Sequence, residues 1–237
     1  MLECAMPNFH VLIPAAGSGS RMGAETPKQY LSLLGKPLIA HTLAIFTAHP
    51  QISSITLVLG VQDTWWEALH LDDASPKLHV ERHGGETRAT TVLNGLLAMQ
   101  QRVRTDDWIL VHDAARPCLS ADLLQHLLDC LHDDTVGGLL AIPLADTLKR
   151  ADYEQRVTNT EQRDGLWLAQ TPQMFRYGLL SRALAAAGGK PTDEAQAVEA
   201  LGLKPKLVPG ELRNLKITYA HDLALAEAIL GADRKKD

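Results

Sequence analysis

The stretch Phe9–Gly23, FHVLIPAAGSGSRMG, joins a short apolar run to a loop of small residues. Its first half, Phe9–Ala15, is brief, apolar and partly β-branched, which is typical of a buried strand. The glycine-rich half follows at once, at the place where an open α/β sheet puts its ligand crevice. The arrangement predicts a strand that ends in a ligand-binding loop.

Short apolar runs alternate with amphipathic segments along the chain that follows. The predicted strands lie at residues 55–60, 78–81 and 108–112. The predicted helices lie at residues 37–49, 87–101 and 120–132. Ser120 is placed to cap the last of these helices. This order predicts an α/β fold with a Rossmann-like, mostly parallel sheet and helices on both of its faces.

The alternation breaks near Gly137 and Gly138. From Leu139 to Phe175 the chain reads as extended pieces, which predicts a protruding arm at about residues 139–170, suited to dimerisation. Beyond it, helices are predicted at residues 177–187, 193–201 and 221–230, and strands at residues 206–208 and 215–218. We find no internal repeat and no flexible linker, so we expect a single domain over residues 1–237 that carries this arm.

Composition and charge narrow the class of protein. The 237 residues include 23 Lys and Arg against 28 Asp and Glu, a formal net charge of −5, which argues against a broad surface for nucleic acid or anionic membranes. The three cysteines have neither CxxC nor zinc-ligand spacing, and the N-terminus lacks a signal-peptide pattern. With no apolar stretch of about 18 residues, we expect a soluble, cytoplasmic protein with no protein-held metal.

The glycine-rich loop suits a phosphate chain. It is neither the dinucleotide fingerprint, because Met22 stands where the third glycine belongs, nor a P-loop. Its small residues let backbone N–H groups approach phosphates, and Arg21 and Lys28 add two positive charges. The alternative is a tight surface turn with two solvated cations.

Two further places carry polar candidates. The stretch Gly84–Thr91 opens a helix, where small residues and a hydroxyl suit a base or ribose, although ordinary helix capping would also account for it. Asp113 follows a predicted strand at its carboxyl end and suits a substrate hydroxyl, a ribose or Mg²⁺, or a structural cap. Arg116 is a second ligand candidate there, or only an ion-pair partner of Asp113.

A series of motifs carries a resemblance to a known family. The loop above, with Pro27-Lys28-Gln29, resembles the nucleotidyltransferases that build activated sugars and alditols. The later motifs, in order, are Gly84–Leu96, Val111–Pro117, Asp146–Lys149, Arg163–Trp167, Gln170–Gln173, Thr192–Ala195 and Asn214–Thr218. Together they are similar to the 2-C-methyl-D-erythritol 4-phosphate cytidylyltransferase family of the non-mevalonate isoprenoid pathway.

The resemblance implies a fold, a reaction and partners. The fold would be of the nucleotidyltransferase, glycosyltransferase-A-like kind. CTP and 2-C-methyl-D-erythritol 4-phosphate would give 4-CDP-2-C-methyl-D-erythritol and pyrophosphate by in-line attack of the substrate phosphate on the α-phosphorus. Mg²⁺ would be held mainly through the CTP phosphates. The enzyme would be a homodimer whose arm reaches the other subunit.

The resemblance also assigns roles to residues. Arg21 and Lys28 would stabilise the transition state, and Arg163 and Lys216 would hold the acceptor for attack. The other substrate-positioning residues would be Thr147, Thr171, Thr192, Asp113 and Arg116. The nucleotide would be bound by Ala15, Ala16, Gly17, Gly19, Gly85, Glu86 and Thr91, where the family usually has Ser in place of Thr91.

Two other functions remain in competition. A cytidylyltransferase for ribitol phosphate or another alditol phosphate shares the glycine loop and the HDAARP-like strand end. A nucleotide-binding module without catalysis is the alternative from another class. The retention of both Arg21 and Lys28 favours the enzyme, because a module that only binds has little need of the pair.

Overall fold

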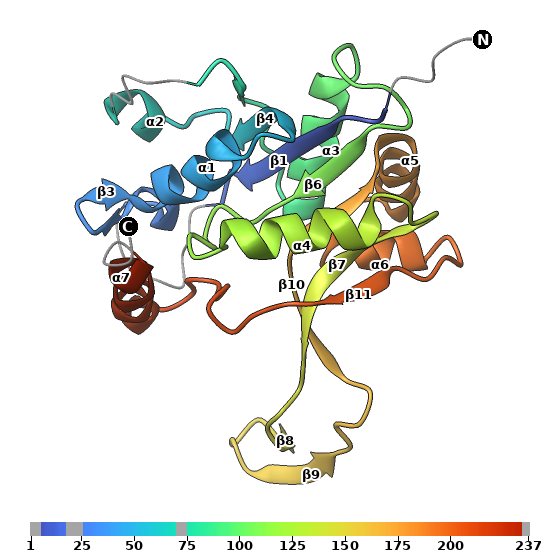
Figure 1. The fold of residues 1–237 in the computed structure, drawn as a ribbon. Helices are drawn as coiled ribbons and strands as arrows, with labels where there is room; N and C mark the ends of the chain where they lie inside the picture. Colours follow the sequence, from blue (N-terminus) through green and yellow to red (C-terminus); the bar gives the residue numbers. More distant parts are fainter. Residues whose placement is uncertain (1–5, 18–25, 70–74, 234–237) are drawn as a thin grey trace.

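The computed structural model describes residues 6–17, 26–69 and 75–233, and its centre is a seven-stranded sheet (Figure 1). In the order β11-β7-β10-β6-β1-β4-β5, the strands are Lys206–Pro209, Gly137–Pro143, Trp167–Arg176, Trp108–Val111, Phe9–Ala15, Ile52–Leu59 and Leu78–Glu81. Among the described strands of this sheet, β10 alone runs antiparallel to its neighbours. The prediction of a mostly parallel sheet is confirmed.

Helices cover both faces of the sheet, as predicted. One face carries α1 (Leu38–Ala48) and α4 (Ala121–Leu131). The other carries α3 (Arg88–Met99), α5 (Tyr177–Ala187) and the short α6 (Glu194–Glu199). Successive side chains of β1 point to opposite faces, so Val11 and Ile13 pack with the first group and Leu12 with the second. Each such buried aliphatic side chain contributes about 1.5–3 kcal/mol, so β1 is fixed from both sides.

Side-chain caps define where three helices begin. The Ser120 hydroxyl accepts a hydrogen bond from the backbone N–H of Leu123 in α4, which confirms the predicted cap. Thr87 caps α3 and Asp193 caps α6 in the same way. Each cap satisfies a backbone N–H that the helix itself leaves without a partner. The starts of α3 and α6 are thereby held at the edge of the sheet where β1 and β6 end.

The C-terminal helix closes the carboxyl side of the fold. The other elements of the body are η2 (Lys28–Tyr30), β2 (Ser32–Leu33), β3 (Lys36–Pro37), α2 (Trp65–Ala68) and the C-terminal helix α7 (Ala220–Asp233). Ala226 of α7 is buried with Leu33, Leu38, Cys118 and Ile217 in a separate apolar cluster. This cluster holds the segment before α7 against the end of the sheet.

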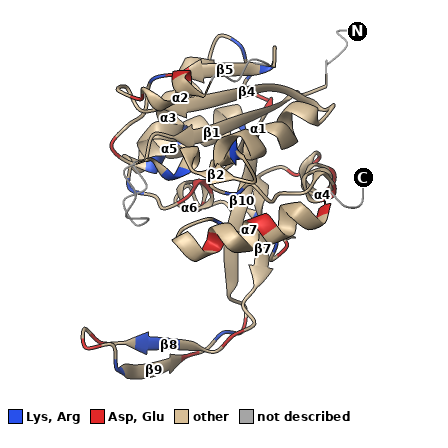
Figure 2. Cartoon of the chain, turned by 90° about the vertical axis from the view of Figure 1, so that its left-hand side faces the viewer, with Lys and Arg blue, Asp and Glu red and all other residues tan. Residues whose placement is uncertain are grey.

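The predicted arm is present, and it is shorter than predicted. β8 (Leu148–Ala151) and β9 (Val157–Glu161) pair as an antiparallel hairpin that projects from the body (Figures 1 and 2). Residues 139–143 and 167–170 lie in the main sheet instead, because β7 and β10 already pair there. The part that leaves the sheet is therefore residues 144–166.

The predicted strand at residues 215–218 is wrong. Residues 215–218 pair with no described strand, and two of them, Lys216 and Thr218, line the cavity together with residues at the ends of β1 and β6. The segment's fixed points are a hydrogen bond from the Ile217 N–H to the Ala115 carbonyl (2.8 Å) and the buried side chain of Asn214. Its alternating pattern reflects burial of Ile217 under α7, while Lys216 faces the site.

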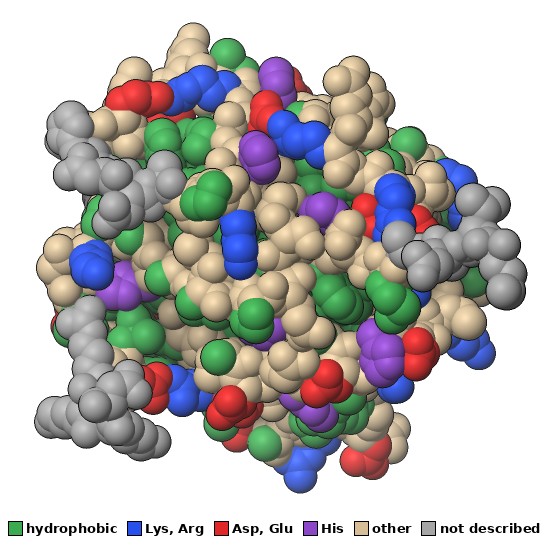
Figure 3. Space-filling model, turned by 45° about the horizontal axis from the view of Figure 1, so that its top comes forward, with side chains coloured by type: hydrophobic (Ala, Val, Ile, Leu, Met, Phe, Trp, Pro, Cys, Tyr) green, Lys and Arg blue, Asp and Glu red, His purple; other side chains and the backbone are tan. Residues whose placement is uncertain are grey.

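Two observations concern the lengths of the described helices and the distribution of surface charge. None of the helices within residues 6–17, 26–69 and 75–233 has the length and apolar character that crossing a bilayer requires. On the face shown in Figure 3, Lys and Arg side chains lie among Asp and Glu and form no continuous basic field.

Candidate active site

A cavity of about 540 Å³ opens at the carboxyl ends of β1 and β6. Five segments form it: the end of β1, η2, the loop into α3, the turn after β6 and the segment before α7. The lining residues are Pro14, Ala15, Ala16, Gly17, Lys28, Gln29, Gly85, Glu86, Thr87, Arg88, Thr91, Asp113, Ala114, Ala115, Lys216 and Thr218. Nine of the residues predicted from the sequence are in that set, namely Ala15, Ala16, Gly17, Lys28, Gly85, Glu86, Thr91, Asp113 and Lys216.

The described start of the first glycine loop, residues 15–17, is anchored by Gln29, which the sequence reasoning did not single out. Its buried side-chain amide donates to the carbonyls of Ala15 (3.0 Å) and Gly17 (3.3 Å). One side chain thereby ties the end of β1 to η2, the element that carries Lys28. Arg21 and Gly19, predicted to bind here, lie outside the described residues.

The second glycine loop packs against the first. A Cβ on Gly84 would stand 2.4 Å from the Cβ of Ala16 and 2.7 Å from the Leu59 carbonyl oxygen, so no larger residue fits. The Gly85 N–H donates to the Thr91 hydroxyl (3.1 Å), which itself donates to the Thr87 carbonyl (2.9 Å). Thr91 is thus tied to the loop's own backbone, while the cap of α3 is Thr87.

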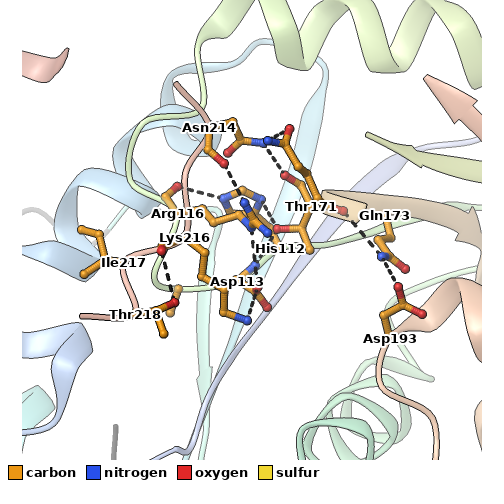
Figure 4. Close-up of polar contacts among 12 residues, drawn as sticks. His112, Asp113, Arg116, Thr171, Gln173, Asp193, Asn214, Lys216, Ile217 and Thr218 are labelled. Carbon is orange, nitrogen blue, oxygen red and sulfur yellow. Dashed lines mark hydrogen bonds and ion pairs between the residues drawn. The ribbon is translucent and has the colours of Figure 1, made fainter. Parts of the chain in front are cut away.

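Asp113 is the centre of the charged floor of the cavity. Its carboxylate contacts Arg88 Nε at 2.9 Å, Lys216 Nζ at 2.8 Å and Arg116 Nε at 3.7 Å. Figure 4 shows the Asp113 and Lys216 side chains pointing toward one another. Burial alone would raise the pKa of Asp113, but the three cations hold it well below its ordinary value. Asp113 is therefore a fixed negative charge that positions Lys216.

Lys28 contacts the segment before α7, which carries the second lysine of the cavity, Lys216. Lys28 Nζ donates to the carbonyl of Ile217 (3.3 Å), the residue next to Lys216. Lys28 comes from η2, and Lys216 comes from a part of the chain 188 residues later. Two ammonium groups brought to one cavity from different elements suit a ligand with several phosphates.

A buried neutral network supports this floor from behind (Figure 4). His112 Nε2 lies 3.1 Å from the Arg116 carbonyl oxygen, which only accepts, so Nε2 carries the proton. Nδ1 then accepts from the Thr171 hydroxyl (3.0 Å), and that oxygen accepts from the Asp113 N–H (3.1 Å). Burial lowers the pKa of His112 to about 4, so the imidazole is neutral at pH 7.

This histidine makes stability depend on pH. Between its ordinary pKa of 6.5 and about 4, the unfolded chain binds a proton at His112 that the folded chain does not. The free energy of unfolding is expected to fall as the pH falls through this window, by up to about 1.4 kcal/mol per unit. Urea unfolding from pH 7 to pH 4, compared with His112→Gln, measures it. A His112 pKa near 6.5 in an NMR titration of the folded protein would contradict this.

Five predicted acceptor-side residues do not line the cavity. Arg116 is buried and donates to the Asn214 carbonyl (2.6 Å), and the Thr171 hydroxyl belongs to the network above. Thr192 is exposed, and its N–H donates to Gln196. Thr147 and Arg163 are exposed on the arm, where Arg163 donates to the Ala145 carbonyl.

One basic residue of the cavity was missed although it lies in a quoted motif. Arg88 is the first residue of α3 and contacts both Asp113 and the fully buried Glu194 of α6. Glu194 follows 106 residues later, so no local spacing could pair the two. The sequence did offer one signal: Arg88 and Glu194 each stand in a quoted motif, close to a residue that was predicted to bind a substrate.

The fold and the cavity together define a class of protein. Glycine loops, two lysines and a fixed carboxylate at the carboxyl ends of a mostly parallel sheet are the parts of an α/β nucleotidyltransferase. The family model of 2-C-methyl-D-erythritol 4-phosphate cytidylyltransferase matches residues 9–232.

Relatives and solved structures agree with that match. The protein of this name from Dechloromonas aromatica is 60% identical over 227 residues, covering 96% of this chain and 99% of the relative. The one from Nitrosospira multiformis is 58% identical, covering 95% and 98%. A crystal structure of 4-diphosphocytidyl-2C-methyl-D-erythritol synthase has a TM-score of 0.84 at 41% identity, covering 94% of this chain and 98% of that one. The cytidylyltransferase from Thermus thermophilus has a TM-score of 0.75 at 33% identity, covering 93% and 97%.

The chain belongs to the 2-C-methyl-D-erythritol 4-phosphate cytidylyltransferase family, and it is a nucleotidyltransferase of the non-mevalonate isoprenoid pathway. The resemblance read from its motifs is confirmed.

Proposed function

We propose that this chain transfers the cytidylyl group of CTP to 2-C-methyl-D-erythritol 4-phosphate and releases 4-CDP-2-C-methyl-D-erythritol and pyrophosphate. An oxygen of the acceptor phosphate attacks the α-phosphorus in line and forms the new P–O bond. The bond from the α-phosphorus to the bridging oxygen breaks, and pyrophosphate leaves with its electron pair. The convergence of Lys28 and Lys216 on one cavity, in a chain of this family, is the observation that carries the proposal.

The residues of the cavity divide between the two substrates. Lys28, together with Arg21, neutralises charge on the α-phosphoryl group and on the leaving pyrophosphate, where such charge develops in the transition state. Lys216, anchored by Asp113, holds the acceptor phosphate for attack. The nucleotide side is formed by Ala15, Ala16, Gly17, Gly19, Gly85, Glu86 and Thr91.

The donor set fits a divalent cation that the nucleotide carries in. The described residues contain no group of three or more His, Cys, Asp or Glu side chains that would hold an ion unaided. Of the carboxylates that line the cavity, Asp113 is already held by cations and Glu86 is exposed. Mg²⁺ bound to the CTP phosphates would neutralise their charge and orient them.

The proposal includes a cytoplasmic homodimer in which the arm serves the partner. Tyr153, on the arm, is 94% exposed, and Val157 is 63% exposed, an apolar surface that a second copy would cover. Arg163 and Thr147 lie on the same arm and outside the cavity of their own chain, so they would act in the cavity of the other subunit.

Replacing Arg163 by alanine is expected to raise the KM for the acceptor by about 10–100-fold, the value of a charged hydrogen bond to phosphate. The KM for CTP should stay near that of the parent chain. Mixed dimers of an Arg163→Ala subunit and a Lys28→Ala subunit should recover activity, because one of their two sites is then complete. Confirmed mixed dimers without recovery would contradict the action across subunits.

A label in the α-phosphate of CTP tests the reaction itself. The proposal predicts that the label appears in an organic diphosphate product, and that pyrophosphate forms in equal amount and carries none. A folded protein that binds CTP but releases no pyrophosphate would support the non-catalytic module instead. Label recovered only in CMP would show hydrolysis rather than transfer.

A further inference from the structure

Glu194 is a buried carboxylate bound to one side of the active site. Its side chain is 0% exposed, and its two oxygens accept from Arg88 Nη1 (2.7 Å) and Nη2 (3.1 Å). The third nitrogen of that guanidinium, Nε, donates to Asp113 (2.9 Å). Asp113 in turn contacts Lys216 (2.8 Å). Four charges of alternating sign thus connect α6 to the ammonium group that faces the cavity.

The Arg88 guanidinium binds two carboxylates, Glu194 through its two Nη atoms and Asp113 through Nε. The fork toward Glu194 is bidentate, the geometry that fixes the orientation of an arginine most strongly. Its contact with Asp113 uses the opposite edge. Although Arg88 lines the cavity, its charge is therefore divided between two protein partners, and it acts on a ligand through Asp113.

The position of Glu194 is itself fixed independently of Arg88. The backbone N–H of Ala195, its neighbour, donates to the side chain of Gln173 in β10 (2.8 Å). The same Gln173 side chain donates to Asp193 (3.0 Å), the cap of α6 (Figure 4). Because the start of α6 is bound to the central sheet, Glu194 is a rigid point from which Arg88 is held.

Burial of a carboxylate is costly, so this arrangement calls for an explanation. Burial raises the pKa of Glu194, and the ion pair with Arg88 opposes that shift. An apolar pair of similar size would pack this place at least as well. What an apolar pair would not supply is a guanidinium of fixed orientation against Asp113.

We propose that Glu194 is a positioning residue for the acceptor side of the site: by holding Arg88 it fixes Asp113, and through Asp113 it fixes the ammonium group of Lys216. The inference rests on the proposed function, because it assigns Lys216 to the acceptor. It predicts that loss of the Glu194 charge lowers kcat/KM for the acceptor and leaves the Kd for CTP unchanged, although Glu194 lines neither part of the cavity.

The decisive variant is Glu194→Gln. Its amide offers one acceptor oxygen, and its NH₂ group faces a second N–H of Arg88, so the bidentate fork is lost. The guanidinium then turns toward Asp113 and competes with Lys216 for it. We expect kcat/KM for the acceptor to fall by about tenfold or more, the size of effect known for residues that orient charged ligands. The Kd for CTP, measured by calorimetry, should stay within about twofold.

Three comparisons separate positioning from a purely structural role. Glu194→Asp keeps the charge and should recover part of the loss. Glu199→Gln removes an exposed charge from the same helix and should leave acceptor kinetics unchanged. In a Lys216→Ala background, Glu194→Gln should add little further loss, because both substitutions act on one ammonium group.

Two results would overturn the inference. One is a Glu194→Gln protein with a lowered Tm but acceptor kinetics equal to those of the parent chain. The other is a loss that adds fully to that of Lys216→Ala. Failure of the proposed function is recognised separately, since the parent chain itself would then show no turnover of methylerythritol phosphate.

Discussion

Lys28→Ala is expected to lower kcat by about 100–1,000-fold, the usual effect of removing one charge-stabilising group from a transition state. Lys28 lines the cavity beside Gly17 and Gln29, and its ammonium lies 3.3 Å from the Ile217 carbonyl oxygen. In the proposed reaction, the phosphates of CTP would lie beside it in this cavity, which Lys216 also lines. Pyrophosphate release at saturating CTP and acceptor measures the loss directly.

The fold should survive this substitution, which keeps the result interpretable. η2 is held by its neighbours, because Gln29 donates to Ala15 and Gly17 and the Tyr30 hydroxyl donates to Asp63 (2.8 Å). The free energy of unfolding should change by no more than about 0.5–1 kcal/mol. Lys36→Ala, at an exposed lysine of β3, is the matched control and should turn over normally. A Lys28→Ala enzyme of near-normal kcat would refute the assignment.

Asp113→Asn is expected to damage stability and activity together. The change removes the carboxylate that faces Arg88, Lys216 and Arg116. Arg88 keeps its ion pair with Glu194, but Arg116 and Lys216 lose the carboxylate that they contact in a mostly buried place. Breaking such a pair costs about 3 kcal/mol of unfolding free energy. Lys216 also loses its anchor, so the KM for the acceptor should rise.

Urea unfolding and steady-state kinetics test both parts of this prediction. Asp122→Asn, in the exposed first turn of α4, removes a carboxylate of ordinary surface kind and should cost less than about 1 kcal/mol. An Asp113→Asn protein as stable as that control would show that the three cations do not depend on Asp113.

Much of the fold could be predicted because its signals are local. The runs at Phe9–Ala15 and Trp108–Val111 are short and apolar, and both are strands of the sheet. Helix caps such as Ser120 act within three residues, so they too can be read from spacing. The carboxyl-end position of the ligand site follows from the order of strands and helices, which is why Asp113 and the glycine loops were expected at one place.

The missed parts depend on contacts between distant segments. The alternation in residues 215–218 resembles that of a strand, but the segment pairs with no described strand of the sheet, and its backbone is held instead by the hydrogen bond from Ile217 to the Ala115 carbonyl. Gln29 could not be selected because its partners are carbonyl groups, which have no residue identity. Arg88 and Glu194 meet only because α6 is bound to β10.

The arm, too, could be predicted only in part, because its extended character is a local signal and its boundaries depend on contacts between distant segments. Its extended character is visible in the sequence, but the point where it leaves the sheet is set by pairing between β7 and β10. Two residues that the sequence placed together in or beside the arm therefore lie in different parts of the structure. Thr171 is buried in the body, and Arg163 is exposed on the arm.

The measurement that tests the central claim most directly is pyrophosphate release with CTP and Mg²⁺, comparing 2-C-methyl-D-erythritol 4-phosphate with ribitol 5-phosphate as the acceptor. The account predicts turnover with the methylerythritol phosphate and none above background with the ribitol phosphate. Turnover with ribitol phosphate alone would keep the mechanism and contradict the substrate. Folded protein that binds CTP and is silent with both acceptors would contradict the account as a whole.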